Sequence, residues 1–191
     1  MKNSLLQQIQ FIKEIDKLKY IQRKTKLFDS DRCENDAEHS WHLAIMTLVL
    51  AEHSNTEIDI LKVLKMVLIH DIVEIDSGDV FIFDTSKEHK NTKEELKAAK
   101  RIFGILPENQ AQELINLWLE FEEGITNEAQ FAKAMDRFEP ILQNTSNKGG
   151  TWREFMVPKE KVIDKTKSIS RGSETIWDYS QNEIESIFNK F

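Results

Sequence analysis

The sequence contains little cysteine, glycine and proline. Its single cysteine, Cys33, excludes an internal disulfide and cannot form a zinc–thiolate centre by itself. Six glycines and three prolines are few for the many tight turns of a sheet protein, so the composition favours helices. The chain is 191 residues long, which is typical of one domain that buries its own core.

Long apolar runs and an excess of basic residues are also absent. The longest nearly uncharged run, Leu43–Ala51, is far shorter than the roughly 20 residues that span a bilayer. Lys13 and Glu14 lie where a signal peptide would be apolar. The net charge of −7 argues against binding of long nucleic acids or of an anionic membrane. We therefore expect a soluble cytoplasmic protein without a nucleic-acid or membrane partner.

Apolar residues recur at three- and four-residue spacing along most of the chain, which predicts helices. No repeat, low-complexity tract or hairpin signal interrupts them. We therefore predict an all-α fold, a bundle of six to eight helices in a single domain. The predicted helices cover about residues 3–20, 36–53, 56–77, 92–103, 108–122, 127–145, 159–167 and 174–190.

Local capping signals mark the ends of the two helices expected at the centre of the bundle. Asn35 or Asp36 can cap the helix over 36–53, and Thr56 can cap the helix that follows. Gly78 is a typical helix terminator. The periodicity is lost over residues 24–35 and 79–91, which we interpret as loops, and again at 147–151.

The C-terminal end of the helix over 56–77 carries a group of ionisable residues. His70 and Glu74 lie four residues apart and Asp71 lies three before Glu74, so these side chains share one face. A helix C-terminus carries partial negative charge, so clustered carboxylates there favour a counter-cation. Imidazole with carboxylate suits Mn, Co, Fe, Ni or Zn better than Ca. An isolated His-Asp pair is more often a solvated helix end. Motifs elsewhere in the sequence are therefore needed to decide whether this pair binds a metal ion.

The wider pattern comprises EHS at 38–40, HDIVEIDSGD at 70–79, and Asp136 in the sequence KAMDRF. It resembles the HD-domain superfamily of metal-dependent phosphohydrolases, and most closely the small bacterial members that include 5′-deoxynucleotidases. The resemblance covers at least residues 15–145. It implies that residues 1–191 form one HD domain, with a metal-site core over about 15–145 and a helical extension over about 151–191.

The resemblance implies a metal centre and a catalytic carboxylate. A divalent ion (Mn, Co, Mg, Fe, Ni or Zn) is expected to acidify a water molecule and to polarise a phosphoryl group. Glu74 follows the metal-binding pair by one helical turn and is expected to act as a catalytic acid or base. The metal ligands that the resemblance implies are His39, His70, Asp71 and Asp136.

The resemblance also implies contacts with the substrate. Asp79 is expected to belong to the catalytic set and to bind a sugar hydroxyl. Arg23 and Arg32 are expected to bind the phosphate, because a guanidinium matches phosphate oxygens bidentately, although either can be an ordinary surface arginine. Some deoxynucleotidases have a Trp after this first Arg. Here Lys24 follows, which leaves the choice between deoxyribose and ribose open.

Other residues near these motifs allow more than one interpretation. His42, three residues after His39, is a polar group near a helix start or an additional partner of the metal site. Lys133 either pairs with a carboxylate of the site or extends along the surface. The segment GGTWREF over 149–155 is a turn that can form one wall of a pocket.

Three functions are compatible with these residues. The first is a metal-dependent phosphomonoesterase that acts on nucleoside 5′-monophosphates or similar small phosphates, and the retention of all four ligand positions favours it. The second is an HD phosphodiesterase or nucleotide polyphosphate hydrolase, and the third is a non-catalytic metal-binding or dimerisation module. The expected partners are a small phosphorylated substrate, a nucleotide, and a second copy of the chain. Relatives are often homodimers, and the last helix carries apolar residues that can either serve an interface or close the core of one chain, namely Ile184, Ile187, Phe188 and Phe191.

Overall fold

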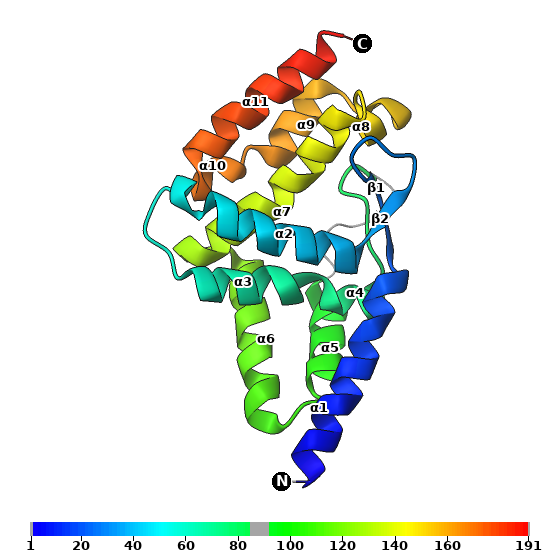
Figure 1. Ribbon diagram of the computed structural model, residues 1–191, viewed down its shortest axis with the longest axis vertical. Helices are drawn as coiled ribbons and strands as arrows, with labels where there is room; N and C mark the ends of the chain where they lie inside the picture. Colours follow the sequence, from blue (N-terminus) through cyan, green and yellow to red (C-terminus); the bar gives the residue numbers. More distant parts are fainter. Residues whose placement is uncertain (1, 85–91, 191) are drawn as a thin grey trace.

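The computed structural model describes residues 2–84 and 92–190, and most of them are helical (Figure 1). None of the helices within these ranges is both long and apolar enough to cross a membrane. In chain order the elements are α1 (Lys2–Ile15), the 3₁₀ helix η1 (Asp16–Tyr20), β1 (Gln22–Lys26), β2 (Cys33–Asn35), α2 (Asp36–Leu50), η2 (Ala51–His53), α3 (Ile60–Ile69), η3 (His70–Val73), α4 (Glu74–Ser77), α5 (Thr92–Phe103), α6 (Glu108–Glu123), α7 (Asn127–Ser146), α8 (Gly150–Glu154), α9 (Lys159–Thr166), α10 (Ile169–Gly172) and α11 (Glu174–Phe188).

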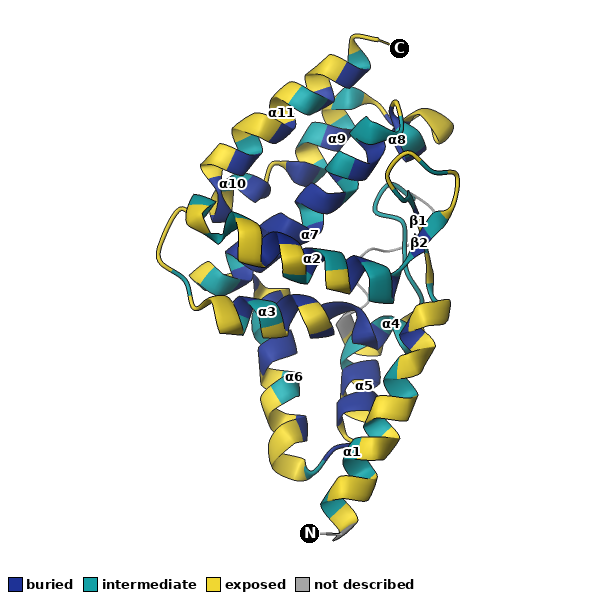
Figure 2. Cartoon of the chain, in the orientation of Figure 1, coloured by how far each residue is buried: buried dark blue, intermediate teal, exposed yellow. Residues whose placement is uncertain are grey.

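Helices α2 and α3 lie side by side across the middle of an elongated molecule (Figure 1). Helices α1, α5 and α6 extend towards the N-terminal end, and α8 to α11 lie towards the C-terminal end. Helix α7 contacts α2, α3, α6, α10 and α11, and it is largely buried (Figure 2). Most of the buried apolar residues form one cluster that includes residues from Leu18 to Ile187. Helix α7 therefore connects both ends of the molecule to the central pair of helices.

The start of α2 is capped as the sequence predicts. The Asn35 side chain accepts a hydrogen bond from the Glu38 N–H at 3.0 Å, and Glu38 accepts one from the Asn35 N–H at 3.1 Å. This reciprocal pair is a capping box. The prediction that Thr56 caps the next helix is wrong. Helix α3 begins at Ile60, because the Asp59 carboxylate accepts the free N–H groups at its start.

The helix predicted over 56–77 is divided into α3, η3 and α4. His70 begins the 3₁₀ turn, and its carbonyl oxygen accepts a hydrogen bond from the Trp118 indole N–H at 3.2 Å. Gly78, with φ of 73°, ends α4 as predicted. A 3₁₀ turn within a longer helical stretch is often found at a functional site.

A two-stranded antiparallel sheet, formed by β1 and β2, lies where the sequence predicts a loop without a hairpin signal. The strands are short and mostly polar, so they lack the alternation of apolar and polar residues that predicts a strand. A distant side chain holds the connection instead. Asn147 donates to the Leu27 carbonyl at 2.9 Å and accepts from the Ser30 N–H at 3.2 Å. The sheet therefore depends on a tertiary contact.

The eight predicted helical stretches are all present, but the described ranges also contain two short helices that were not predicted, α8 and α10. The helices within the described ranges are therefore more numerous than the predicted six to eight. Each of these helices has no more than five residues, too few for a visible periodicity. Helix α10 packs closely on α7, and a Cβ atom at Gly172 would lie 2.5 Å from the Gln130 carbonyl oxygen. Only glycine allows this approach.

Candidate metal and phosphate site

The four predicted metal ligands converge from three separate elements. His39 lies in α2, the pair His70-Asp71 in η3, and Asp136 in α7. Asp136 Oδ1 lies 3.2 Å from His39 Nε2 and 3.7 Å from His70 Nε2. Asp71 Oδ1 lies 3.0 Å from His70 Nε2, and Asp71 Oδ2 lies 3.9 Å from His39 Nε2. All four side chains are buried, and ligand atoms of His39, His70 and Asp136 lie within 4.8 Å of one another, as binding of a single ion requires.

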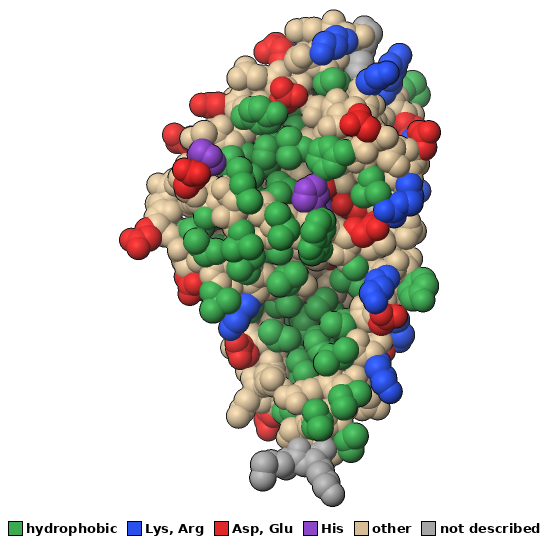
Figure 3. Space-filling view, in the orientation of Figure 1, with side chains coloured by type: hydrophobic (Ala, Val, Ile, Leu, Met, Phe, Trp, Pro, Cys, Tyr) green, Lys and Arg blue, Asp and Glu red, His purple; other side chains and the backbone are tan. Residues whose placement is uncertain are grey.

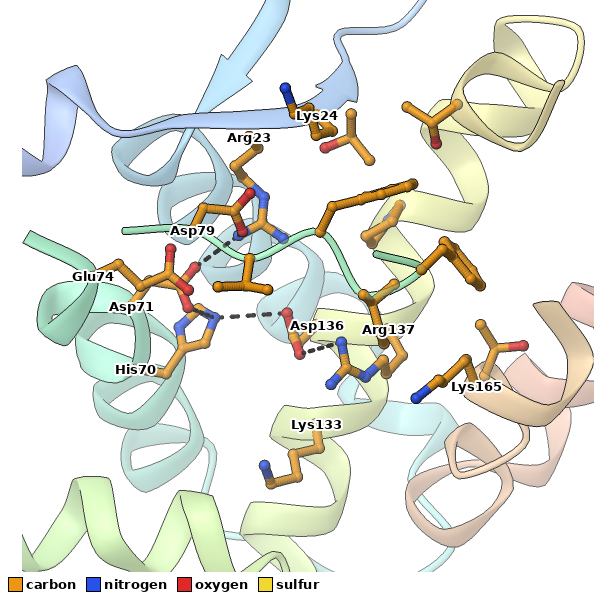
Figure 4. Close-up of a pocket in the computed structure, with 18 of the residues that line it drawn as sticks. Arg23, Lys24, His70, Asp71, Glu74, Asp79, Lys133, Asp136, Arg137 and Lys165 are labelled. Atoms are coloured by element: carbon orange, nitrogen blue, oxygen red, sulfur yellow. Dashed lines mark hydrogen bonds and ion pairs between the residues drawn. The ribbon is translucent and has the colours of Figure 1, made fainter. Parts of the chain in front are cut away.

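His70 is oriented so that its Nε2 atom faces this group (Figure 4). Its Nδ1 atom lies 2.9 Å from the Val67 carbonyl oxygen, which can only accept, so Nδ1 carries the proton. The lone pair is then on Nε2. That buried atom has no hydrogen-bond partner within residues 2–84 and 92–190. A buried nitrogen acceptor without a donor fits coordination to a metal ion.

Two buried carboxylates support His39 from behind, and sequence reasoning did not find them. His39 Nδ1 lies 3.3 Å from Glu139 Oε2 and 3.5 Å from Glu34 Oε2. The Glu139 carboxylate also accepts a hydrogen bond from His42 at 3.2 Å. His42 is therefore a partner of Glu139, which in turn contacts His39. Burial alone would raise the pKa of Glu139, but hydrogen bonds from His39 and His42 lower it to about 2.

One signal in the sequence points to Glu139: it lies three residues after Asp136, on the same face of an otherwise well-buried helix. Glu34 gives no comparable signal, because it lies in the short strand that no pattern predicts. Burial and the Arg23 charge lower the pKa of His39, but Asp136 and these two carboxylates outweigh them and raise it well above its usual value. The surroundings of the His39 ring therefore stabilise positive charge on it.

A second group of carboxylates adjoins the first. Asp36, Glu74 and Asp79 offer oxygen atoms that lie within 4.8 Å of one another. Burial, followed by the charge of Asp71, raises the pKa of Asp36 to about 7. Burial, Asp71 and Asp36 also raise the pKa of Glu74 well above its usual value. Glu74 therefore holds its proton to a higher pH than an ordinary carboxyl group does, which favours a role as a catalytic acid.

Arg23 is the cation at the centre of these carboxylates. Its Nη1 atom lies 3.0 Å from Asp71, 3.5 Å from Asp36 and 3.9 Å from Asp79. Burial disfavours the guanidinium charge, yet Asp71 and Asp79 raise the pKa of Arg23 well above its usual value. One arginine among this many buried carboxylates leaves an excess of negative charge, and buried charge needs compensation. A divalent cation bound by His39, His70, Asp71 and Asp136 would supply it.

Arg32 is not brought to the site. Its side chain is exposed and forms a two-pronged ion pair with Glu38, with N–O distances of 3.0 and 2.8 Å. Glu38 is the residue that completes the cap of α2. Arg32 therefore stabilises the start of the helix that carries His39, and it does not line the cavity described next.

A cavity of about 490 Å³ opens onto the metal-ligand group. Figure 4 shows Glu74, Asp79 and Asp71 on one side of Asp136, and Arg137 and Lys165 on its other side. Arg137 Nη1 lies 3.6 Å from Asp136 Oδ2. Although burial opposes it, this cation together with His39 lowers the pKa of Asp136 well below its usual value. The cavity thus has a carboxylate end and a cationic end, and Arg137 is a second residue that the sequence did not suggest.

Aromatic, amide and further charged side chains complete the lining. Trp152 belongs to it, which confirms that the segment over 149–155 forms part of a pocket wall. Lys133 lines the cavity as well, with its Nζ atom 4.4 Å from the centre of the Phe121 ring and 3.9 Å from Glu122. Other lining side chains are Lys24, Phe81, Phe83 and Asn144.

The fold is mostly helical, and it brings His39, His70, Asp71 and Asp136 together beside a cavity that the last three of them line. These features define a helical protein built around a candidate metal centre. The chain belongs to the HD domain family, whose model matches residues 15–177. It is 30% identical to a bovine (Bos taurus) protein named 5′-deoxynucleotidase HDDC2 over 154 residues, which cover 77% of this chain and 73% of that protein. The human (Homo sapiens) protein of the same name is 32% identical over 137 residues, or 71% of this chain and 65% of that protein.

A solved structure is also similar along nearly the whole chain. It is the crystal structure of a predicted metal-dependent phosphohydrolase from Magnetospirillum magnetotacticum, with 45% identity and a TM-score of 0.93. The match covers 98% of this chain and 94% of that chain. The C-terminal helices of the present chain therefore belong to an arrangement that this relative shares.

Proposed function

We propose that this protein is a metal-dependent phosphomonoesterase that acts on nucleoside 5′-monophosphates or similar small phosphates. The observation that carries the proposal is the convergence of two histidines and two aspartates at a cavity that also contains a protonatable glutamate. The names of the relatives support it, since several are called 5′-deoxynucleotidases and one is called a predicted metal-dependent phosphohydrolase.

The metal ligands in this proposal are His39, His70, Asp71 and Asp136. A divalent ion, when bound, supplies Lewis acidity and lowers the pKa of water. The surrounding residues orient and restrain the ligands. Glu139 and Glu34 hold the His39 ring, and the Val67 carbonyl holds the His70 ring.

Proton transfer is assigned to Glu74. Its raised pKa lets it hold a proton near the leaving 5′ oxygen, or accept one from the attacking water. Asp79 lies 3.9 Å from Arg23 at the same end of the cavity, where we expect it to bind a sugar hydroxyl. Arg23 remains a candidate phosphate contact, because a guanidinium has five N–H donors and Asp71 does not use them all.

Arg137 is an additional candidate for the phosphate. It follows the ligand Asp136 directly in α7 and points into the cavity (Figure 4). A cation beside the metal ligands can offset the charge of a phosphoryl group that binds there. The half-buried aromatic ring of Phe81 offers a surface for a nucleobase, and a cavity of about 490 Å³ lies within the range of small-molecule sites.

A nucleotide polyphosphate hydrolase is the second candidate. Lys24, Lys165 and Arg137 all line the cavity, and this number of cations suits a substrate with more than one phosphate. The sugar preference also remains to be measured, because Lys24 follows Arg23 directly.

A phosphate-release screen tests the proposal. The purified protein is assayed with nucleoside and deoxynucleoside monophosphates, diphosphates, cyclic nucleotides and sugar phosphates, each with Mn, Co, Mg, Fe, Ni or Zn. We expect release from monophosphates, loss of release after chelation, and the best recovery with Mn or Co. Release that survives exhaustive metal removal contradicts the proposal, and a clear preference for diphosphates favours the second candidate.

We also propose that the protein acts in the cytoplasm as a homodimer. Its single cysteine suits a reducing compartment. The sequence allows the last helix either an interface or a core role, and its described apolar residues serve the core. Ile184 and Ile187 are buried within the chain and Trp152 stacks on Phe188, while Phe191 lies outside the described residues. The interface must use another surface.

A further inference from the structure

Helices α2 and α7 contact each other through two pairs of polar side chains. His39 Nε2 lies 3.2 Å from Asp136 Oδ1, and we call these two residues the inner pair. His42 Nδ1 lies 3.2 Å from Glu139 Oε1, and we call these the outer pair. In each helix the two residues are three positions apart, so the pairs follow one another along the facing sides of the helices.

Glu139 joins the outer pair to the inner pair. Its Oε1 atom accepts the hydrogen bond from His42, and its Oε2 atom lies 3.3 Å from Nδ1 of His39. A histidine that binds a metal through one ring nitrogen usually donates the N–H of the other to a carboxylate, which fixes the orientation of the ring. The orientation of the His39 ring therefore depends on how firmly Glu139 is held.

His39 alone is not sufficient to hold the Glu139 carboxylate. Glu139 is 0% exposed, and a buried carboxylate needs hydrogen-bond donors. The Glu34 carboxylate lies 3.5 Å from the same Nδ1 atom of His39, which has a single N–H to offer. Helix α2 has no Lys or Arg, and Figure 3 shows mainly apolar side chains over it, with cations towards the edges of this face. His42 therefore supplies a donor that Glu139 needs.

The His42 ring is itself restrained by two aromatic neighbours. The Phe28 ring, from the connection between β1 and β2, meets it edge-on with the ring centres 5.6 Å apart. The Trp41 ring stacks on it with the ring centres 6.1 Å apart. His42 belongs to none of the groups of closely spaced ligand atoms in the described part of the chain. It is therefore placed to hold Glu139 and not to bind the ion itself.

We infer that His42 is a positioning residue of the metal centre, which holds the His39 ring in place through Glu139. The inference rests on the proposed function, because it takes His39 as a metal ligand. It adds that a residue without contact to the ion affects how tightly the ion is bound. The partly exposed side chain of His42 thereby becomes part of the machinery of a buried site.

Calorimetric titration with Mn²⁺, in the absence of any phosphate substrate, tests the inference. In His42→Ala we expect the Mn²⁺ dissociation constant to rise by about 3- to 10-fold, less than the effect of losing the direct partner of a metal-binding histidine. At saturating Mn²⁺, kcat should stay close to that of the wild type, because all four ligands are present. His53→Ala, at a half-buried histidine in η2, is the matched control and should keep the wild-type affinity.

Two further variants separate the hydrogen bond from the volume of the ring. His42→Asn keeps a side-chain N–H near the position of Nδ1, so it should recover most of the Mn²⁺ affinity. His42→Leu fills a similar volume without a donor and should bind Mn²⁺ as weakly as His42→Ala. Circular dichroism checks that each variant is folded. If His42→Ala does not fold, the comparison of His42→Asn with His42→Leu decides, and equal affinities in these two overturn the inference.

A double-variant cycle tests whether His42 acts through Glu139. In a Glu139→Ala background, His42→Ala should cause no further change in Mn²⁺ affinity, because the carboxylate that connects His42 to His39 is absent. Fully additive changes would overturn the inference, since His42 would then act by another route. A wild-type affinity in folded His42→Ala overturns it as well but leaves the proposed function intact. A wild type that binds no divalent ion overturns both.

Discussion

The two sides of α2 differ in what they cover: one side buries polar residues together with Leu43 and Met46, and the other leaves large apolar residues exposed. One side buries Asp36, His39 and Ser40, whereas the other exposes Trp41 and Val49. An ordinary surface helix buries its apolar stripe and exposes its charges. The difference shows that what each side contacts, more than hydrophobicity, decides which residues of this helix are covered.

The polar side can be buried because its charges have partners. Arg23 lies within 3.5 Å of Asp36, and His39 contacts carboxylates on both of its ring nitrogens. Removing a charge from water costs several kcal/mol per ion unless it is compensated. The apolar side carries no charge, so no residue of the chain is needed to compensate one there. Substitutions of five residues test the polar side and its partners.

Removal of a metal ligand should have the largest effect. In Asp71→Ala we expect phosphate release to fall by about 10³-fold or more. The reason is that a weakly held metal ion would no longer stabilise the negative charge of the transition state. His70→Ala should behave in the same way. Circular dichroism should show an unchanged helical content, and Asp178→Ala, at an exposed position of α11, is the control. Full activity in Asp71→Ala contradicts the assignment of this residue to the metal.

Removal of the proton-transfer group should have the next largest effect. In Glu74→Ala we expect kcat to fall by roughly 10²-fold, the lower range for general acid–base catalysis, while metal affinity is retained. Steady-state kinetics and calorimetric metal titration measure the two quantities separately. An unchanged kcat would remove Glu74 from the mechanism. A lost metal affinity would make it a ligand.

Removal of the carboxylate behind His39 should weaken metal binding without removing a ligand. In Glu139→Ala we expect the metal dissociation constant to rise by about 10- to 100-fold, the usual effect of losing a group that orients a metal-binding histidine. Glu139→Gln should recover part of the affinity, because it keeps a hydrogen-bond acceptor for the ring. Glu123→Ala, at an exposed end of α6, is the control. An affinity that is equal in all three variants would show that Glu139 does not position His39.

Removal of the cap of α2 should have the smallest effect. In Asn35→Ala we expect the free energy of unfolding to fall by about 1 kcal/mol, because the Glu38 N–H loses its acceptor. Urea unfolding measures this change, and Asn182→Ala, on the exposed surface of α11, should leave the stability unchanged. If Asn35→Ala is as stable as the wild type, contacts on the two sides of α2 hold its start without the cap.

The predicted helices and the candidate ligands were accessible from the sequence because both depend on local patterns. Spacing of three and four residues marks a helix, and the His-Asp pair is visible as two adjacent letters. The strands β1 and β2 were missed because Asn147, more than one hundred residues away, holds their connection. The division of the third helix at His70 was missed for a similar reason, since the contact from Trp118 comes from another helix.

The sequence by itself determined which segments are helical and which residues are chemically able to bind a metal ion. Only the tertiary structure decided their surroundings. It brought Arg23 among the carboxylates, left Arg32 at the surface, and placed Glu139 behind His39. It also left the apolar side of α2 exposed. The physical reason is that helix formation depends on neighbours along the chain. Burial, pKa and charge compensation depend on residues that only folding brings together.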